Sequence, residues 1–216
     1  LNLEGSKWDG ARDVLNQFRL NGRYYCAIYE ISFDSLLYYR KSVLEGAGLK
    51  DPRTLFENDE WTWDTFLDMA RQFQQSGDGK YVIEGYNPEN EFVVSTGTPI
   101  IENDGTKLIN NMNNANVERV MDLLSTLQKE NLRYPLHELN GWSVNPKAWA
   151  QGDILFYGNG GTWEFEGDSG LNKFAQRFGW NDDEICVVPY PRDPQADKYY
   201  HFMKQDAMMW CKGSTN

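Results

Sequence analysis

The stretch Trp61–Ile83, WTWDTFLDMARQFQQSGDGKYVI, predicts a helix, a tight turn and a strand in immediate succession. Thr62 is a good N-cap residue, and Asp64 lies in the first turn, where a negative charge favours the helix dipole. Apolar side chains at helical spacing predict one buried face, made of Trp63, Phe66, Leu67, Ala70 and Phe73. The turn Gly77-Asp78-Gly79 ends the helix, and Tyr81–Ile83 is predicted as a strand. We therefore expect this helix to pack against a sheet.

Short strands and amphipathic helices alternate along the chain on both sides of this stretch. Apolar runs predict strands at Tyr24–Tyr29, Leu36–Tyr39, Ile154–Tyr157, Ile185–Val188 and Ala207–Cys211. Apolar side chains at helical spacing predict helices at 8–20, 42–46, 117–127, 146–152 and 171–178. We expect loops at Asp51-Pro52 and after Ile83, and a turn between two short strands at Asn103-Asp104-Gly105. The alternation predicts an α/β fold with helices packed on a central sheet.

The charge balance and the scarce metal-binding side chains exclude several classes of function. The formal net charge is −11, which disfavours binding to nucleic acid or to an anionic membrane surface. The widely spaced Cys26, Cys186 and Cys211 form no CxxC pair, and His137 and His201 match no metal-binding spacing. The longest apolar runs are far shorter than a membrane span. We expect no metal and no cofactor.

Aromatic residues are unusually abundant, with 8 Trp, 12 Tyr and 11 Phe among 216 residues. Tyr and Trp combine a flat apolar face with a polar group. Such side chains suit a protein core, but they also suit a sugar, which has an apolar C–H face and a rim of hydroxyl groups. Most of these rings are expected in the core, and a minority are candidates for contact with a ligand.

Several short segments also follow one another in a characteristic order. They are Leu37-Tyr38-Tyr39-Arg40-Lys41, Ala47-Gly48-Leu49, Trp61–Phe66, Gln151–Phe156, Gly160-Gly161-Thr162-Trp163, Ile185–Pro191 and Cys211–Asn216. Over nearly the whole chain, this order resembles the extracellular solute-binding proteins of ABC importers, carbohydrate type. Two positions depart from the family pattern. Arg40 stands where the family usually has Asn, and Leu155-Phe156 replaces the commoner Ala-Met.

The resemblance implies a lobe of the type II periplasmic-binding-protein-like fold, with a mixed sheet flanked by helices. Such proteins have two lobes that close over a ligand by a hinge motion. Residues 1–29 would be a remnant of the first lobe, 30–206 the second lobe, and 207–216 a strand returning toward the first lobe. Whole family members are about twice as long, so we expect a fragment, and we expect the signal sequence to lie outside it.

The resemblance places the family's stacking tryptophan at Trp163, which is the strongest candidate for contact with a ligand. It follows the Gly160-Gly161 turn, where the missing side chains let the backbone come close and leave the indole unobstructed. Gly161 is therefore a second candidate. The alternative is that Trp163 is a core residue that anchors the turn.

Four further candidates lie around the end of the predicted strand at Tyr81–Ile83. By resemblance this region faces the cleft, so Tyr86 and Phe92 could contact the ligand there. Glu84 and Asn87 could bind its hydroxyl groups. The alternative is an ordinary solvated loop.

The last four candidates lie at the two crossings between lobes. Tyr199 and Tyr200 precede the return strand, and because strand side chains alternate, one should face the cleft and the other the interior. Glu30 and Asp34 lie at the first crossing, and carboxylates bind sugar hydroxyls strongly. The alternative is that Glu30 and Asp34 are ordinary surface charges near the hinge.

The resemblance implies the substrate-binding component of an ABC transporter, which captures a sugar or oligosaccharide and delivers it to permease subunits in the membrane. It also implies an extracellular or periplasmic location, with a lipid anchor on the full-length protein. The alternative is a glycosidase, which needs two carboxylates flanking the scissile bond. Glu164 and Glu166 lie beside Trp163, but their spacing indicates one side of an exposed strand, so we expect no enzymatic activity.

Overall fold

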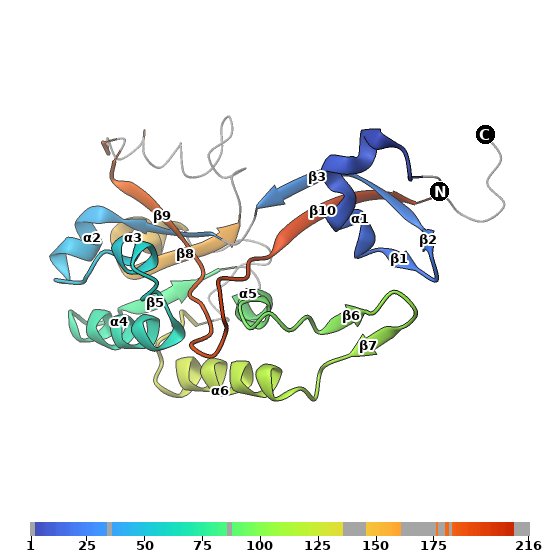
Figure 1. The fold of residues 1–216 in the computed structure, drawn as a ribbon. Coiled ribbons are helices and arrows are strands. Elements are labelled where there is room, and N and C mark those ends of the chain that lie inside the picture. The colour runs from blue at the N-terminus through green and yellow to red at the C-terminus, as the bar shows by residue number, and fades with distance from the viewer. Residues whose placement is uncertain are drawn as a thin grey trace.

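The computed structural model describes residues 3–33, 36–85, 88–135, 146–160, 176, 180–181 and 183–209 (Figure 1). In this part of the chain the largest sheet has four strands, in the order β5–β8–β4–β9. Their bounds are β4 (Leu36–Arg40), β5 (Tyr81–Glu84), β8 (Ile154–Gly160) and β9 (Ile185–Pro189). β5 runs parallel to β8, whereas β4 is antiparallel to both β8 and β9. The sheet is mixed, as predicted.

Helices that bury apolar faces flank this sheet. Their bounds are α2 (Lys41–Gly46), α3 (Pro52–Glu57), α4 (Trp63–Gln75), α5 (Pro88–Val94), α6 (Ala115–Lys129) and α7 (Pro146–Gln151). The helix expected after Thr62 is α4, where Thr62 and Thr65 form a reciprocal capping box. Trp63, Phe66 and Phe73 of α4 are buried in the main core, which confirms the predicted apolar face.

Two helices occupy stretches that were predicted as loops. In α3 the Asp51 carboxylate accepts a hydrogen bond from the backbone N–H of Arg53 at 2.9 Å, and Pro52 takes the first helical position. These residues therefore start a helix instead of interrupting the chain. The second is α5, which follows β5. Its Phe92 has no exposed surface, because the apolar side of this short helix packs into the main core.

The N-terminal unit has a small core of its own, made of Leu3, Leu15, Tyr24 and Ile28. It consists of η1 (Ser6–Ala11), α1 (Arg12–Asn16), β1 (Arg19–Leu20), β2 (Arg23–Tyr24), β3 (Cys26–Phe33) and β10 (Met203–Met209). β3 pairs with β10 in a separate antiparallel sheet. The helix predicted at 8–20 is split and shorter: Ser6–Ala11 is a 3₁₀ helix and α1 ends at Asn16. Arg19 and Leu20 instead pair with Tyr24 and Arg23, across a two-residue turn in which Asn21 and Gly22 have positive φ angles of 49° and 73°.

The predicted turn at Asn103-Asp104-Gly105 is confirmed. It joins β6 (Ile101–Asn103) to β7 (Leu108–Asn110), and the two strands form a hairpin. The hairpin extends from the rest of the molecule toward β1 and β2 (Figure 1). We call the four-stranded sheet, its helices and this hairpin the main unit.

Candidate functional site

The first candidate site is the edge of the sheet where β5 and β8 end. The two strands are parallel neighbours, so their carboxyl ends lie at the same edge, and Glu84 is in register with Tyr157. The strands approach very closely just beyond this point, since a Cβ atom on Gly85 would lie 2.4 Å from the carbonyl oxygen of Gly158. In open α/β sheets, ligands bind outside the carboxyl ends of the strands.

Glu84 is the most unusual side chain at this edge. It is only 2 % exposed, and neither carboxyl oxygen has a hydrogen-bond partner in the described part of the chain. Burial raises the pKa of this carboxyl from 4.5 to about 8, so the group is mainly protonated at neutral pH. A protonated carboxyl can both donate and accept a hydrogen bond. Because buried polar groups normally have partners, the unpaired carboxyl of Glu84 is the feature of this edge that stands out.

Trp149 adds a second unsatisfied polar group near the same edge. Its ring centroid lies 5.7 Å from that of Tyr157, the register partner of Glu84. The indole Nε1–H is buried and has no acceptor among the described residues. The sequence predicts the short helix that carries Trp149, but it does not reveal which side of that helix faces the sheet. Trp149 was therefore not among the predicted site residues.

Phe92 does not belong to this edge. It lies in α5 and packs against Trp63, Phe66 and Tyr190, with ring centroids 6.5, 5.7 and 5.5 Å away. With no exposed surface, it fills the core. The prediction that Phe92 contacts a ligand assumed a loop at this position, so we no longer include Phe92 in the candidate site.

The two tyrosines near the return strand point to different surroundings. Tyr199 stacks on His201, with centroids 6.1 Å apart and an interplanar angle of 17°, and it also packs against Phe56 of the main core at 4.7 Å. The ring of Tyr200 lies against Gly97, where an added Cβ would come within 2.6 Å of the ring. Tyr199 is thus the inward-facing member of the pair.

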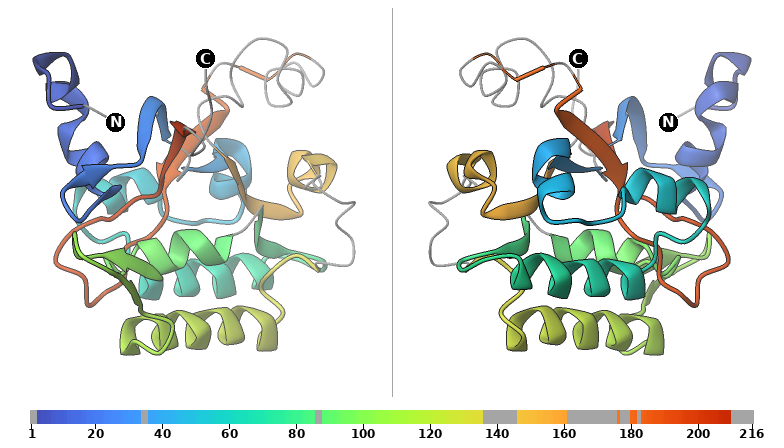
Figure 2. Two further views of the ribbon diagram at one scale, coloured as in Figure 1. Left: turned by 90° about the vertical axis from the view of Figure 1, so that its right-hand side faces the viewer. Right: turned by 90° about the vertical axis from the view of Figure 1, so that its left-hand side faces the viewer.

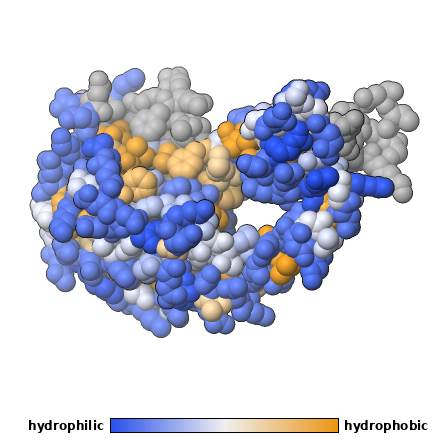
Figure 3. Space-filling view, viewed as in Figure 1, coloured by the Kyte–Doolittle hydropathy of each residue, from blue (hydrophilic) through white to orange (hydrophobic). Residues whose placement is uncertain are grey.

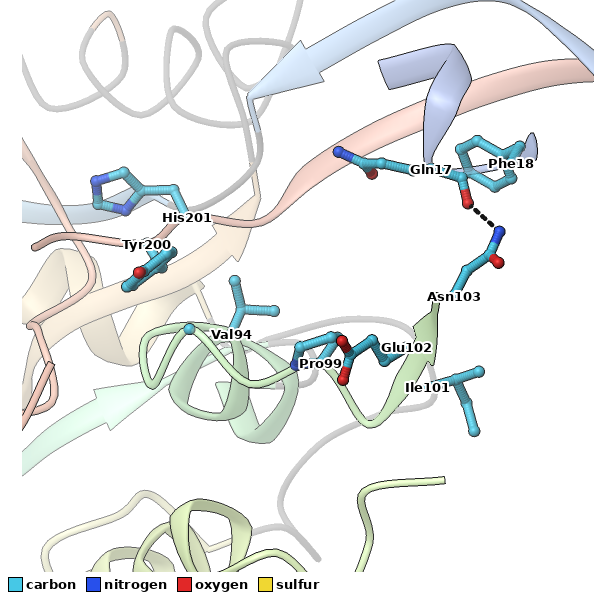
Figure 4. A pocket seen from close by; sticks show the side chains of 10 residues that line it. Gln17, Phe18, Val94, Pro99, Ile101, Glu102, Asn103, Tyr200 and His201 are labelled. Atoms are coloured by element: carbon cyan, nitrogen blue, oxygen red, sulfur yellow. Dashed lines mark hydrogen bonds between the residues drawn. The ribbon is translucent and has the colours of Figure 1, made fainter. Parts of the chain in front are cut away.

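Tyr200 lines a cavity of about 510 Å³ between the N-terminal unit and the main unit (Figure 4). Its walls come from Gln17 and Phe18 on one side, from the start of the β6–β7 hairpin on the other, and from His201 at one end. Burial lowers the pKa of His201, which keeps its imidazole neutral at neutral pH. The cavity is lined by different residues from those at the edge around Glu84.

The remaining predicted site residues fall into two groups. Glu30 is an exposed residue of β3 and lies in register with Asp206 of β10. The others lie outside the described residues: Trp163, Gly161, Tyr86, Asn87 and Asp34. Gly161 directly follows the last residue of β8, and Tyr86 follows β5 by two residues.

No group of three or more His, Cys, Asp and Glu side chains in the described part of the chain is arranged to hold a metal ion. Within the same residues, no helix combines the length and the apolar character needed to cross a bilayer.

A comparison with protein families gives one match that spans nearly the whole chain. The model of a family described as bacterial extracellular solute-binding protein matches residues 2–203. None of the curated proteins compared is similar to the chain in sequence.

Solved structures share the fold at low sequence identity. An ABC transporter associated binding protein from B. animalis subsp. lactis Bl-04, in complex with β-1,6-galactobiose, is 16 % identical over 93 % of this chain and 46 % of its own, with a TM-score of 0.61. A family 1 extracellular solute-binding protein from Bifidobacterium longum subsp. infantis is 17 % identical over 96 % and 51 %, with a TM-score of 0.64.

A third structure carries a different kind of ligand. UgpB from Mycobacterium tuberculosis, in complex with glycerophosphocholine, is 14 % identical over 93 % of this chain and 48 % of its own, with a TM-score of 0.54. The chain thus spans about half the length of these solved structures.

Proposed function

The chain belongs to the bacterial extracellular solute-binding protein family, and from this premise we propose that it is part of a receptor that captures a solute for an ABC importer. The family match over residues 2–203 is the observation that carries the proposal. The edge where β5 and β8 end supports it, because Glu84 offers a buried polar group without a partner among the described residues.

The proposed ligand is a sugar or oligosaccharide. One protein of the same fold binds β-1,6-galactobiose, and another binds glycerophosphocholine; both ligands are rich in oxygen atoms that take part in hydrogen bonds. The protonated Glu84 can donate to a ligand oxygen, and Trp163 with Gly161 would supply a flat face just beyond β8. Tyr86 and Asn87 would complete the site just beyond β5.

We also propose the division into lobes that the sequence predicts, with residues 1–29 as part of a first lobe, 30–206 as the second, and 207–216 as a return strand. The separate core and the separate β3–β10 sheet of the N-terminal unit support it. β3 and β10 pair from Cys26 with Met209 to Phe33 with Met203, and the two proposed boundaries lie opposite each other within this ladder, where Glu30 pairs with Asp206. Glu30 and Tyr200 would then lie near the hinge.

The partner is a membrane permease, and the protein acts on the outer face of the membrane or in the periplasm, in keeping with the extracellular family. A lipid anchor on the full-length protein would hold it there. No chemical step takes place, because capture and lobe closure are sufficient for delivery. Closure is favoured only as far as the ligand contacts the closed form better than the open one. We do not retain the glycosidase alternative, since the family is one of binding proteins.

The test is a titration of intrinsic tryptophan fluorescence with a panel of oligosaccharides, beginning with β-1,6-galactobiose. We expect a saturable shift without product formation. Trp163→Ala should abolish the shift and weaken binding at least tenfold, as expected for the loss of a stacking platform. Trp8→Ala, in the N-terminal unit, is the matched control and should retain wild-type affinity. Turnover of a chromogenic glycoside would overturn the proposed function. Unchanged affinity of the Trp163→Ala variant would remove Trp163 from the site.

A further inference from the structure

The tip of the β6–β7 hairpin is hydrogen-bonded to the N-terminal unit. The Asn103 side-chain amide donates from Nδ2 to the carbonyl oxygens of Gln17 and Arg19, at 2.8 and 3.2 Å. In the opposite direction, the backbone N–H of Asn21 donates to the carbonyl oxygen of Gly105 at 2.7 Å. These three bonds join segments more than eighty residues apart in the chain.

Both sides of this contact are shaped before they meet. On the hairpin, Asn103 Oδ1 accepts the N–H of Gly105 at 2.9 Å, which turns its amide group outward, and Gly105 has a φ angle of +88° that favours glycine. On the N-terminal unit, the tight Asn21-Gly22 turn presents the Asn21 N–H. Because both sides are already shaped, little conformational freedom is lost on contact. These exposed hydrogen bonds are therefore stronger than the bonds that flexible side chains would form.

The contact lies apart from β3 and β10, the paired strands through which the chain passes between the two units. We call these two the connecting strands. The 510 Å³ cavity separates it from Tyr200 and His201, which lie next to the start of β10 (Figure 4). The space-filling view shows the surface hollowed between the two units, with the hairpin meeting the N-terminal unit at the far side of the opening (Figure 3). The N-terminal unit is therefore held at two separate places, at the connecting strands and at the hairpin tip.

The hairpin and the candidate ligand edge lie on opposite sides of the connecting strands. Seen along the sheet in Figure 2, β5 and α7 lie to one side of β10, and the β6–β7 hairpin lies to the other. In that projection, a rotation about β3 and β10 that carries the N-terminal unit toward the β5 edge carries it away from the hairpin. The hairpin bonds have to break during that rotation.

We propose that the Asn103 contact is a latch that restrains the N-terminal unit and opposes closure over the ligand. The proposal rests on the proposed function for its consequence, since closure matters only if a ligand binds at the β5 edge. The latch stabilises the open form of the free protein. Releasing it raises the apparent affinity for the ligand, because a smaller part of the binding energy is used to change the conformation.

Asn103→Asp is the sharpest variant. The carboxylate keeps the acceptor for the Gly105 N–H, but it places an oxygen against the carbonyl oxygens of Gln17 and Arg19. Two of the three bonds are therefore replaced by repulsion, and only the bond from the Asn21 N–H to Gly105 remains. Asn111→Asp is the matched control. It adds the same charge near the same hairpin, and the Asn111 side-chain amide donates to Pro99 and Glu102 within the main unit. Asn103→Ser is a second latch variant without the added charge.

The first measurement needs no ligand. Residual dipolar couplings of the ¹⁵N-labelled full chain report the angle between the N-terminal unit and the main unit, and the same spectra show that each variant is folded. We expect one alignment to fit both units in the wild type and in Asn111→Asp, and two different alignments to be needed in Asn103→Asp and Asn103→Ser. The latch is refuted if the wild type already needs two alignments, or if the Asn103 variants match the control.

The second measurement is the affinity for β-1,6-galactobiose and the rest of the oligosaccharide panel. Loss of two ordinary hydrogen bonds predicts binding about three- to tenfold tighter in Asn103→Asp than in Asn111→Asp. Equal or weaker binding would show that the hairpin does not oppose closure. If neither the wild type nor any variant bound an oligosaccharide of the panel, that result would count against the proposed function. The dipolar couplings would still decide whether the latch holds the two units together.

Discussion

Gly85 and Gly158 lie so close that a Cβ atom on Gly85 would stand 2.4 Å from the carbonyl oxygen, 2.7 Å from the carbonyl carbon and 2.9 Å from the Cα of Gly158. All three are backbone atoms, so no side-chain movement could relieve the overlap. Gly158 is crowded as well, since a Cβ atom on it would stand 2.3 Å from the Tyr190 hydroxyl. This close approach holds β5 against β8 at the edge that carries Glu84.

Gly85→Ala should therefore push the two strands apart. We expect a loss of about 1–3 kcal/mol in the free energy of unfolding, the usual range for overpacking, together with weaker binding of the ligand because Glu84 is displaced. Urea denaturation and ligand titration measure the two effects.

Gly46→Ala is the control for this prediction. Gly46 is a residue of α2, and a Cβ there would meet no atom within 4 Å. Since alanine is the better helix former, this variant should be more stable by about 0.5–1 kcal/mol. Similar effects of both substitutions would show that crowding at Gly158 is not the cause.

The buried carboxyl of Glu84 should make the stability of the protein depend on pH. Its pKa is raised from 4.5 to about 8 in the folded chain, so the folded state holds a proton that the unfolded state releases above pH 4.5. The favourable contribution of the neutral carboxyl is complete below pH 4.5 and is lost as the pH rises toward 8. The slope can reach about 1.4 kcal/mol per pH unit.

Glu84→Gln keeps the shape of the side chain and removes the titration. Urea denaturation at pH 5, 7 and 9 should show the variant gaining stability over the wild type as the pH rises. The exposed substitution Glu57→Gln serves as the control and should follow the wild-type curve. A constant difference between Glu84→Gln and the wild type across this range would contradict the assignment.

The segment that follows β9 is held on α6 by an ion pair between the partly exposed Arg119 and the buried Asp193. Asp193 is fully buried, and its Oδ1 also accepts the N–H of Gln195 at 2.9 Å. Asp193→Ala leaves the Arg119 guanidinium without its partner carboxylate, which should cost about 3 kcal/mol in thermal or urea unfolding.

The exposed Asp197 provides the comparison, because it accepts a hydrogen bond from the Tyr200 hydroxyl at 2.9 Å without being buried. Asp197→Ala should cost less than about 1 kcal/mol. If Asp193→Ala and Asp197→Ala proved equally stable, the Arg119–Asp193 ion pair would not be the interaction that holds the segment after β9 on α6.

Local patterns were sufficient for the elements whose signals lie within a few residues. The apolar spacing of Trp63, Phe66 and Phe73 and the cap at Thr62 predict α4 correctly, because helix periodicity and capping depend on neighbours in the chain. At Asp51-Pro52 the sequence predicts a loop, but an N-cap followed by proline also begins a helix, as it does in α3. The apolar run at Ile185–Val188 similarly predicted β9.

The sequence by itself determined the alternation of helices and strands, the family and the candidate residues around the ends of β5 and β8. Only the tertiary structure decided which of these candidates are core, since the burial of Phe92 and Glu84 depends on partners distant in the chain. It alone revealed the bonds from Asn103 to Gln17 and Arg19. The physical reason is that periodicity and capping act over a few residues, whereas burial, close strand approach and contact between units arise only when distant segments pack together.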